Sequence, residues 1–174
     1  MQEVLTPILA GLKASQIVLK ELNARGKAGN RSSKVTDALH LPFSKYLESL
    51  GYKVQLEGKI PSWINVTGIH KADMVVQDEK VVFEFKHVKS SYAKNHANFA
   101  KNLLSEVKEA EDAGYKCNQI FIVNKDLLTK SYIKMWKDFP LYKMNILVLT
   151  YLDGELKPVN SLEDFIYRAE ILQA

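Results

Sequence analysis

Two carboxylates and a lysine stand close together near the middle of the 174-residue chain. Asp73 begins a short apolar run, and Glu84 and Lys86 follow a second run that starts with Val81 to Phe83. Because successive side chains of a strand point to opposite faces, Glu84 and Lys86 share a face. If the two runs pair as an antiparallel hairpin around the polar turn 78–80, Asp73 returns beside them. Two carboxylates and one ammonium group are suited to metal-assisted cleavage of a phosphodiester.

A solvated ion pair on an exposed sheet is the alternative interpretation of Glu84 and Lys86, and such a pair contributes at most about 1 kcal/mol. The second run, however, has apolar residues on both faces where it begins, which is typical of a buried strand. Charges at the end of a buried strand are unfavourable unless they are paired or bind a metal. The context therefore favours a site.

Asp73, ten intervening residues and then Glu84, Phe85 and Lys86 resemble the motif of the PD-(D/E)xK nuclease superfamily, with Ala72 where that motif often has proline. The resemblance implies a restriction-endonuclease-like α/β fold, in which helices flank a central mixed β-sheet. It also implies an Mg²⁺-dependent endonuclease, with Mn²⁺ as a substitute, that leaves a 5′-phosphate and a 3′-hydroxyl. We expect Asp73, Glu84 and the carbonyl of Phe85 to bind the metal. Lys86 would polarise the attacking water or stabilise the transition-state charge.

A further ligand for the metal or for a proton often comes, in this superfamily, from the helix before the first core strand. On that predicted helix the candidates are Asp37, His40 and Glu48, although none is an obvious acid at the expected place. His40 shares a helical face with Leu47, so it is either a ligand or a hydrogen-bonded core residue. Gln119, on the strand that follows the hairpin, is a further candidate to face the site.

The net charge of +4 and the pI near 9.0 permit binding to nucleic acid without requiring it. Two stretches without acidic residues, 24–36 and 86–102, carry much of the positive charge. A run of like charge is usually a solvated surface, but both stretches flank the proposed site in the sequence. The residues that we expect to contact nucleic acid are Arg25, Lys27, Arg31, Lys34, Lys89, Lys94 and His96.

Length and hydrophobic content predict a single nuclease domain over residues 1–174. Within it we expect an N-terminal helix and basic loop (1–32), a nuclease core (33–125) and a C-terminal helix-strand-helix segment (126–174). Hydrophobic periodicity predicts helices, strands and one loop. The predicted helices are Leu5–Leu22, Ser33–Leu50 with a kink or restart at Pro42, Ala93–Gly114, Leu127–Trp136 and Leu162–Ile171; the strands are Tyr52–Leu56, the hairpin, Gln119–Val123 and Ile146–Leu152; the loop is Pro61–Ile69.

The chain has one cysteine, no apolar run long enough to span a membrane and no signal segment, so we expect a cytoplasmic protein with no membrane partner. The resemblance favours a small type II restriction endonuclease that acts on double-stranded DNA as a homodimer. A Holliday-junction resolvase or another DNA-processing nuclease is the close alternative. The alternative of another class is a noncatalytic nucleic-acid-binding or assembly protein on the same fold.

Overall fold

The computed structural model describes residues 2–24, 31–88, 96–138 and 144–173. The chain divides into two compact units, Met1–Val54 and Gln55–Ala174. Within the described residues, no helix is both long enough and apolar enough to cross a membrane. The expectation that residues 1–174 act as one nuclease domain remains a prediction.

The first unit is a pair of helices, α1 (Gln2–Ala24) and α2 (Arg31–Ser49), and both were predicted. The two helices approach closely at Gly11, where an added Cβ would collide with the main-chain carbonyl oxygen of Leu39. Only a glycine fits at this contact, because any side chain would collide with main-chain atoms that cannot move independently. The close contact between α1 and α2 is therefore possible because position 11 is a glycine, which has no Cβ.

The course of α2 agrees only in part with the prediction. The helix continues through Pro42 without a restart, and the alternative expectation, a kink there, remains a prediction. A proline removes a single main-chain donor, and the residues around it on the apolar face, Leu39 and Phe43, are buried. Gly51 ends the helix as predicted, with a φ of +99° that favours glycine. The N–H of Tyr52 then donates to the carbonyl of Leu47 at 3.3 Å.

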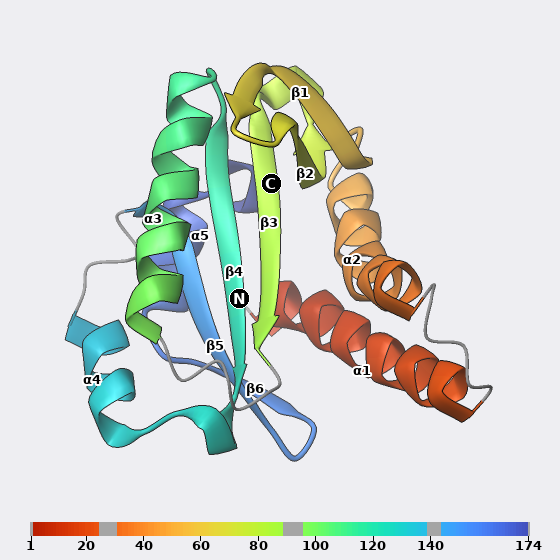
Figure 1. The fold of residues 1–174 in the computed structure, drawn as a ribbon, viewed down its shortest axis with the longest axis vertical. Coiled ribbons are helices and arrows are strands. Elements are labelled where there is room, and N and C mark those ends of the chain that lie inside the picture. The colour runs from red at the N-terminus through yellow and green to blue at the C-terminus, as the bar shows by residue number, and fades with distance from the viewer. Residues whose placement is uncertain (1, 25–30, 89–95, 139–143, 174) are drawn as a thin grey trace. The chain divides into compact units, whose positions relative to one another are not determined.

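The second unit is a six-stranded mixed sheet in the order β1-β2-β3-β4-β5-β6 (Figure 1). The first three strands pair antiparallel, β3, β4 and β5 pair parallel, and β6 returns antiparallel to β5. These features confirm the α/β class and the mixed sheet. The strands are β1 (Gln55–Asn65), β2 (Gly68–Val76), β3 (Val81–Val88), β4 (Lys116–Asn124), β5 (Ile146–Leu152) and β6 (Glu155–Pro158); the α-helices are α3 (His96–Asp112), α4 (Lys130–Asp138) and α5 (Leu162–Arg168).

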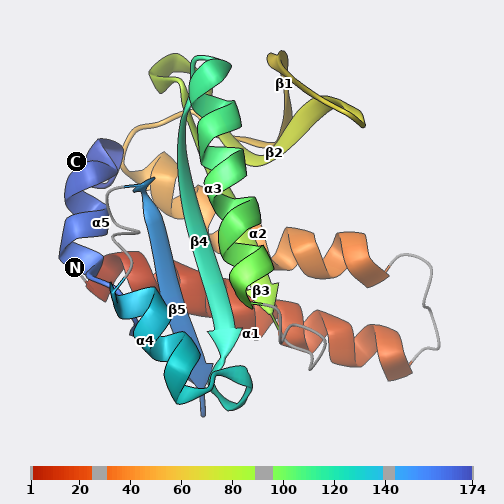
Figure 2. The same ribbon diagram turned by 60° about the vertical axis from the view of Figure 1, so that its left-hand side comes forward.

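Helices cover both faces of this sheet within the second unit. On one face, Leu103 of α3 and Trp136 of α4 belong to the same buried apolar cluster as Val82 and Phe121 of the sheet, and α3 lies along β4 in both ribbon views (Figures 1 and 2). On the other face, the ammonium group of Lys116 donates to the main-chain carbonyl at the end of α5. The side chains of Glu84 and Lys86 point to the α3 face, because they alternate with their neighbours along β3.

The predicted hairpin is present. Val76 pairs with Val81 across a 3₁₀ turn at Gln77–Glu79, and Lys80 closes the turn with a φ of +55°. The predicted helix Leu162–Ile171 begins as α5 with an N-terminal cap, in which the hydroxyl of Ser161 accepts from the main-chain N–H of Asp164 at 3.2 Å.

The interpretation of residues 61–69 as a loop was wrong. β1 begins at Gln55, later than predicted, and runs through Pro61 and Trp63. A two-residue turn, Val66–Thr67, then leads directly into β2. β1 lies at the edge of the sheet, where a strand tolerates proline, and its pairing with β2 is irregular between Lys59 and Ile64. The long hairpin β1–β2 replaces a short strand and a loop.

The fold also contains a strand that the sequence analysis did not predict, β6. It forms a hairpin with β5 through Asp153 and Gly154, both with positive φ. An Asp-Gly pair between apolar runs is a strong hairpin signal.

Candidate active site

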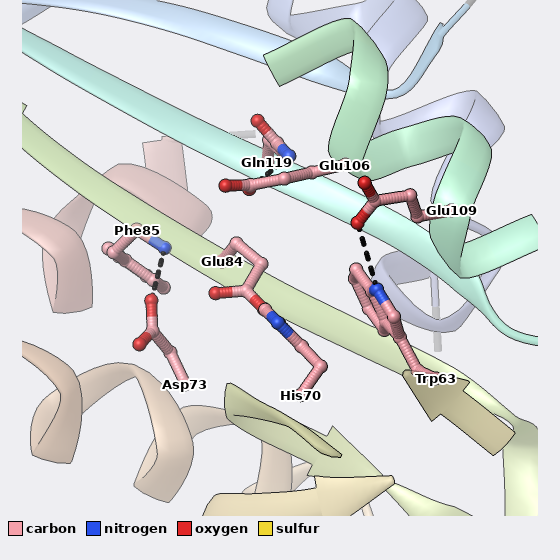
Figure 3. Close-up of polar contacts among 8 residues, drawn as sticks. All are labelled: Trp63, His70, Asp73, Glu84, Phe85, Glu106, Glu109 and Gln119. Carbon is pink, nitrogen blue, oxygen red and sulfur yellow. Dashed lines mark hydrogen bonds and ion pairs between the residues drawn. The ribbon is translucent and has the colours of Figure 1, made fainter. Parts of the chain in front are cut away.

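The pairing of β2 with β3 stops one step before the predicted carboxylates. Met74 pairs with Phe83, and the next pair would join Asp73 to Glu84, but the ladder of main-chain hydrogen bonds does not continue to them. Instead, the N–H of Phe85 donates to the Asp73 carboxylate, Oδ2, at 2.8 Å (Figure 3). The two strands separate here, and a side chain replaces the missing main-chain partner. The structure thus brings Asp73 and Glu84 together at the open end of the hairpin.

His70 holds the carboxylate of Glu84. Its Nε2 lies 2.8 Å from Glu84 Oε1, and both side chains are largely buried, with exposed fractions of 16% and 13%. The imidazole in turn stacks on the indole of Trp63, with ring centroids 3.8 Å apart and planes inclined by 19°. The indole Nε1–H donates to Glu109 Oε2 at 3.1 Å. A continuous chain of contacts therefore joins Glu84 on β3 to helix α3, through residues of β2 and β1 (Figure 3).

Helix α3 adds a third carboxylate, that of Glu106. Its Oε2 accepts a hydrogen bond at 3.0 Å from the amide Nε2 of Gln119, which lies next to Glu84 in the parallel register of β3 and β4. Gln119 is fully buried, and among the described residues its Oε1 has no hydrogen-bond partner. Gln119 was predicted to face the site, and the structure places it there.

Burial and neighbouring negative charge raise the pKa values of Glu84 and Glu106. Burial raises the pKa of Glu84 well above its usual range, and the negative charges of Asp73 and Glu106 raise it further. Burial also raises the pKa of Glu106, and the nearby charge of Lys86 acts in the opposite direction. Burial lowers the pKa of His70, although the surrounding acids oppose this shift. The site therefore has more buried negative charge than its own basic groups readily neutralise.

Lys86 lies on the same strand face as Glu84 but is exposed. It contributes to the wall of an open groove of about 320 Å³ beside the carboxylates. The groove gives the site access to solvent on the α3 face. Its lining residues are Asn65, Val66, Thr67, His70, Lys86, Asn102, Ser105, Glu106 and Glu109.

Three features bear on whether this site fits a divalent cation. In the described part of the chain, no group of three or more His, Cys, Asp or Glu side chains is arranged as a metal-binding cluster. Mg²⁺, however, usually keeps several waters and binds through only one or two protein carboxylates. Asp73 and Glu84 provide such a pair, and the buried, unpartnered Oε1 of Gln119 is an additional oxygen acceptor beside it. The oxygen-rich donor set suits a hard cation.

The candidates on the predicted second helix belong to the first unit. His40 is buried, with an exposed fraction of 3%, whereas Asp37 and Glu48 are exposed on α2. A role for any of them at the site remains a prediction. For Phe85 the structure describes the contact of its N–H with Asp73, and a role for its carbonyl remains a prediction as well.

Most of the residues expected to contact nucleic acid lie outside the described part of the chain. Lys34 is exposed on α2. His87, the neighbour of Lys86, is half-buried and bonds to Asn124 Oδ1 at 3.0 Å, so its ring is engaged within the sheet. The residues that fall outside the described part are Arg25, Lys27, Lys89 and Lys94, together with the side chains of Arg31 and His96.

The sequence analysis missed Glu106 and His70. Glu106 follows Leu103 by three positions and precedes Val107, so it borders the apolar stripe of α3. An acid at the edge of such a stripe is a signal, because it points toward the sheet beneath. His70 gave no clear signal, since it lies next to the segment that was taken for a loop.

Comparison with models of protein families, with curated proteins and with solved structures found no match to this chain. Its function therefore has to be inferred from the side chains at the site.

Proposed function

We propose that this protein is an Mg²⁺-dependent DNA endonuclease with a restriction-endonuclease-like core. The observation that supports the proposal is the gathering of Asp73, Glu84 and Glu106 at the open end of a hairpin, beside the exposed ammonium group of Lys86. Burial and neighbouring negative charge raise the pKa values of Glu84 and Glu106, and such a cluster of carboxylates is unfavourable in the absence of a cation. A phosphodiester bound in the groove would meet both the cation and Lys86.

The chain's own residues have separate roles in this proposal. Asp73 and Glu84 hold the ion, and the hydrogen bonds from Phe85 N–H and His70 orient their carboxylates. When bound, Mg²⁺ supplies charge neutralisation and lowers the pKa of a bound water. Lys86 stabilises the negative charge that develops on the phosphate in the transition state.

Glu106 contributes from the opposite wall of the site. Its carboxylate is held by Gln119 and lies close enough to Lys86 for the ammonium group to lower its pKa. We infer that Glu106 orients Lys86 or a water on the ion. It would therefore fill the role that the sequence analysis sought on the preceding helix.

Double-stranded DNA is the proposed substrate, and a type II restriction endonuclease the proposed class. The net charge of +4 favours binding to a polyanion. A chain of this size with one site would cut both strands most simply as a homodimer, which is also part of the proposal. Magnesium is the proposed cofactor, with manganese as a substitute.

The test is incubation of the purified protein with supercoiled plasmid and with phage genomic DNA, in Mg²⁺ or in EDTA. Lys86→Ala removes the ammonium group from the groove. Lys157→Ala is the matched control, because Lys157 is exposed on β6, where its neighbour is Glu155 at 3.9 Å. We expect cleavage that requires Mg²⁺, falls by about 10²–10³-fold in Lys86→Ala and is unchanged in Lys157→Ala.

The pattern of products separates the alternatives. Discrete fragments identify a sequence-specific restriction endonuclease, and cleavage confined to branched DNA identifies a junction resolvase or another DNA-processing nuclease. DNA binding by the wild type without cleavage of any of these substrates would contradict the proposal and favour a noncatalytic nucleic-acid-binding protein.

A further inference from the structure

The turn between β1 and β2 exposes three apolar side chains. Ile64, Val66 and Ile69 have exposed fractions of 72%, 104% and 52%, and they lie within six residues of one another. Single exposed apolar residues are common on protein surfaces, but three around one turn form a compact apolar tip. We call residues 64–69 the hairpin tip.

The hairpin tip is held in one conformation by its own hydrogen bonds. Asn65 Oδ1 accepts from the main-chain N–H of Thr67 at 3.0 Å and from its hydroxyl at 2.6 Å. Gly68 then adopts a φ of +119°, which only glycine adopts readily. Asn65 and Gly68 pair across the turn, so Val66 and Thr67 alone form the loop. The exposure of Val66 is thus a property of a preorganised turn.

The hairpin tip is also fastened to the candidate active site. Ser62, next to the tip, donates from its hydroxyl to the carbonyl of Ala113 beyond the end of α3 at 2.8 Å. Trp63 is 1% exposed and connects the tip to Glu84 through its stack on His70. These contacts place an apolar projection at a constant position relative to the catalytic carboxylates.

One groove joins the hairpin tip to the residues of the proposed chemistry. Its wall includes Asn65, Val66 and Thr67 of the tip, and it also includes His70 and Lys86. A molecule whose phosphate lies at Lys86 would therefore extend along the groove to the tip. In nucleic acid, each phosphate joins two sugars that carry bases with flat apolar faces, and these faces match the exposed side chains of the tip.

We propose that the hairpin tip is a wedge that inserts Val66 and Ile64 between neighbouring bases of the nucleic acid beside the scissile phosphate. This inference rests on the proposed function and specifies its substrate. Inserting an apolar side chain requires two bases to unstack, which is easiest where they are already unpaired or mismatched. The wedge therefore binds a bulged duplex more tightly than a continuous one, while continuous duplex, in which the two bases must first unstack, remains a substrate for cleavage.

The experiment measures binding without cleavage. A duplex with a central bulge and a matched continuous duplex each carry 2-aminopurine beside the bulge position, and both are titrated with protein in EDTA. Unstacking by the wedge raises the fluorescence of 2-aminopurine. We expect the wild type to raise it and to bind the bulged DNA more tightly, and Ile64→Ser with Val66→Ser to lose the signal and about tenfold in affinity for the bulge.

The matched control is Leu152→Ser, which removes an exposed apolar side chain (44%) beside the turn of the other hairpin, β5–β6. It should behave as the wild type does. Circular dichroism shows whether the tip variant keeps its fold; a variant that unfolds is replaced by Val66→Ala alone, which is expected to weaken the signal.

Several outcomes would overturn the wedge. One is equal binding of both duplexes by the wild type, and another is a tip variant that keeps the full signal. Absence of DNA binding, with association of the tip with lipid vesicles or with a second copy of the chain, would assign the tip another partner. Cleavage in Mg²⁺ is scored separately on continuous plasmid, so an active enzyme whose tip variant is unaltered refutes the wedge and leaves the proposed function intact.

Discussion

Replacing Glu84 by glutamine should stabilise the metal-free protein at a pH high enough to ionise Glu84. Burial and the charges of Asp73 and Glu106 raise the pKa of Glu84 well above its ordinary value of 4.5. The folded protein therefore binds this proton more tightly than the unfolded chain does. The resulting stabilisation is fully present below pH 4.5 and is lost as the pH rises through the raised pKa. Glutamine has no titratable proton, so the free energy of unfolding of the variant does not decrease in this way as the pH rises.

The size of the effect follows from the position of the two carboxylates on adjacent strands. The strands separate at Asp73 and Glu84, but the two carboxylates remain close enough for the charge of Asp73 to raise the pKa of Glu84. Two like charges about 5 Å apart repel by about 3 kcal/mol at an effective dielectric constant of about 20. The substitution also alters the hydrogen bond between His70 and Glu84, which contributes about 1 kcal/mol. The repulsion between the carboxylates outweighs the hydrogen bond, so the variant should be about 2 kcal/mol more stable once Glu84 is ionised.

The assay is urea unfolding in EDTA at pH 5 and at pH 9, followed by tryptophan fluorescence. Both tryptophans, Trp63 and Trp136, lie in the second unit, so the signal reports on the sheet that carries the site. Glu111→Gln, at an exposed position on α3, is the control and should change stability equally at both pH values. A wild type more stable than Glu84→Gln at pH 9 would refute the reasoning, because Glu84 would then be a favourable partner of His70. Mg²⁺ should stabilise the wild type more than the variant.

Three further outcomes are expected. Cys117 should react with a thiol reagent only in urea, because burial excludes the reagent and raises the pKa of the thiol well above its usual range; the native and unfolded rates check this. Glu106→Gln should increase the Mg²⁺ concentration for half-maximal cleavage by about 10–100-fold, measured by metal titration. Gly11→Ala should destabilise the α1–α2 pair by about 1–3 kcal/mol, since its Cβ would meet the carbonyl of Leu39, and thermal unfolding by circular dichroism would show it.

The fold was most predictable where each segment is determined by its own residues. The hairpin around Gln77–Glu79 and the strand Ile146–Leu152 follow from apolar runs and a polar turn, and both are present. The segment 61–69 was misjudged because Pro61 and a mixed pattern are typical of a loop. In the structure it comprises the end of the edge strand β1, a two-residue turn and the start of β2. The buried Trp63 of β1 depends on contacts with α3 that no local pattern contains.

The residues of the site likewise differ in how far the sequence could predict them. Asp73 and Glu84 come together through a single short turn, so their spacing in the sequence was enough to predict their proximity. Glu106 reaches them only after the chain has left β3 and formed α3. Which of its turns faces Glu84 depends on where that helix begins and how it packs on β4. The position of Gln119 was easier to predict, because this residue lies at the register position of β4 that pairs with Glu84.

The charges of the site favour a ligand-binding role over a purely structural one. A structural network normally pairs each buried acid with a base, since unpaired charge is strongly unfavourable in the interior. The ion pair at this site joins Glu84 to His70, whose pKa is lowered by burial, so the imidazole does not readily carry the compensating charge. Lys86 is exposed and acts on Glu106 from the side of the groove. Without a cation, the carboxylates reduce their mutual repulsion by binding protons, and this is why the pKa values of Glu84 and Glu106 are raised. A divalent cation would neutralise this cluster and leave the carboxylates ionised, and this is the condition that hydrolysis of a phosphodiester requires.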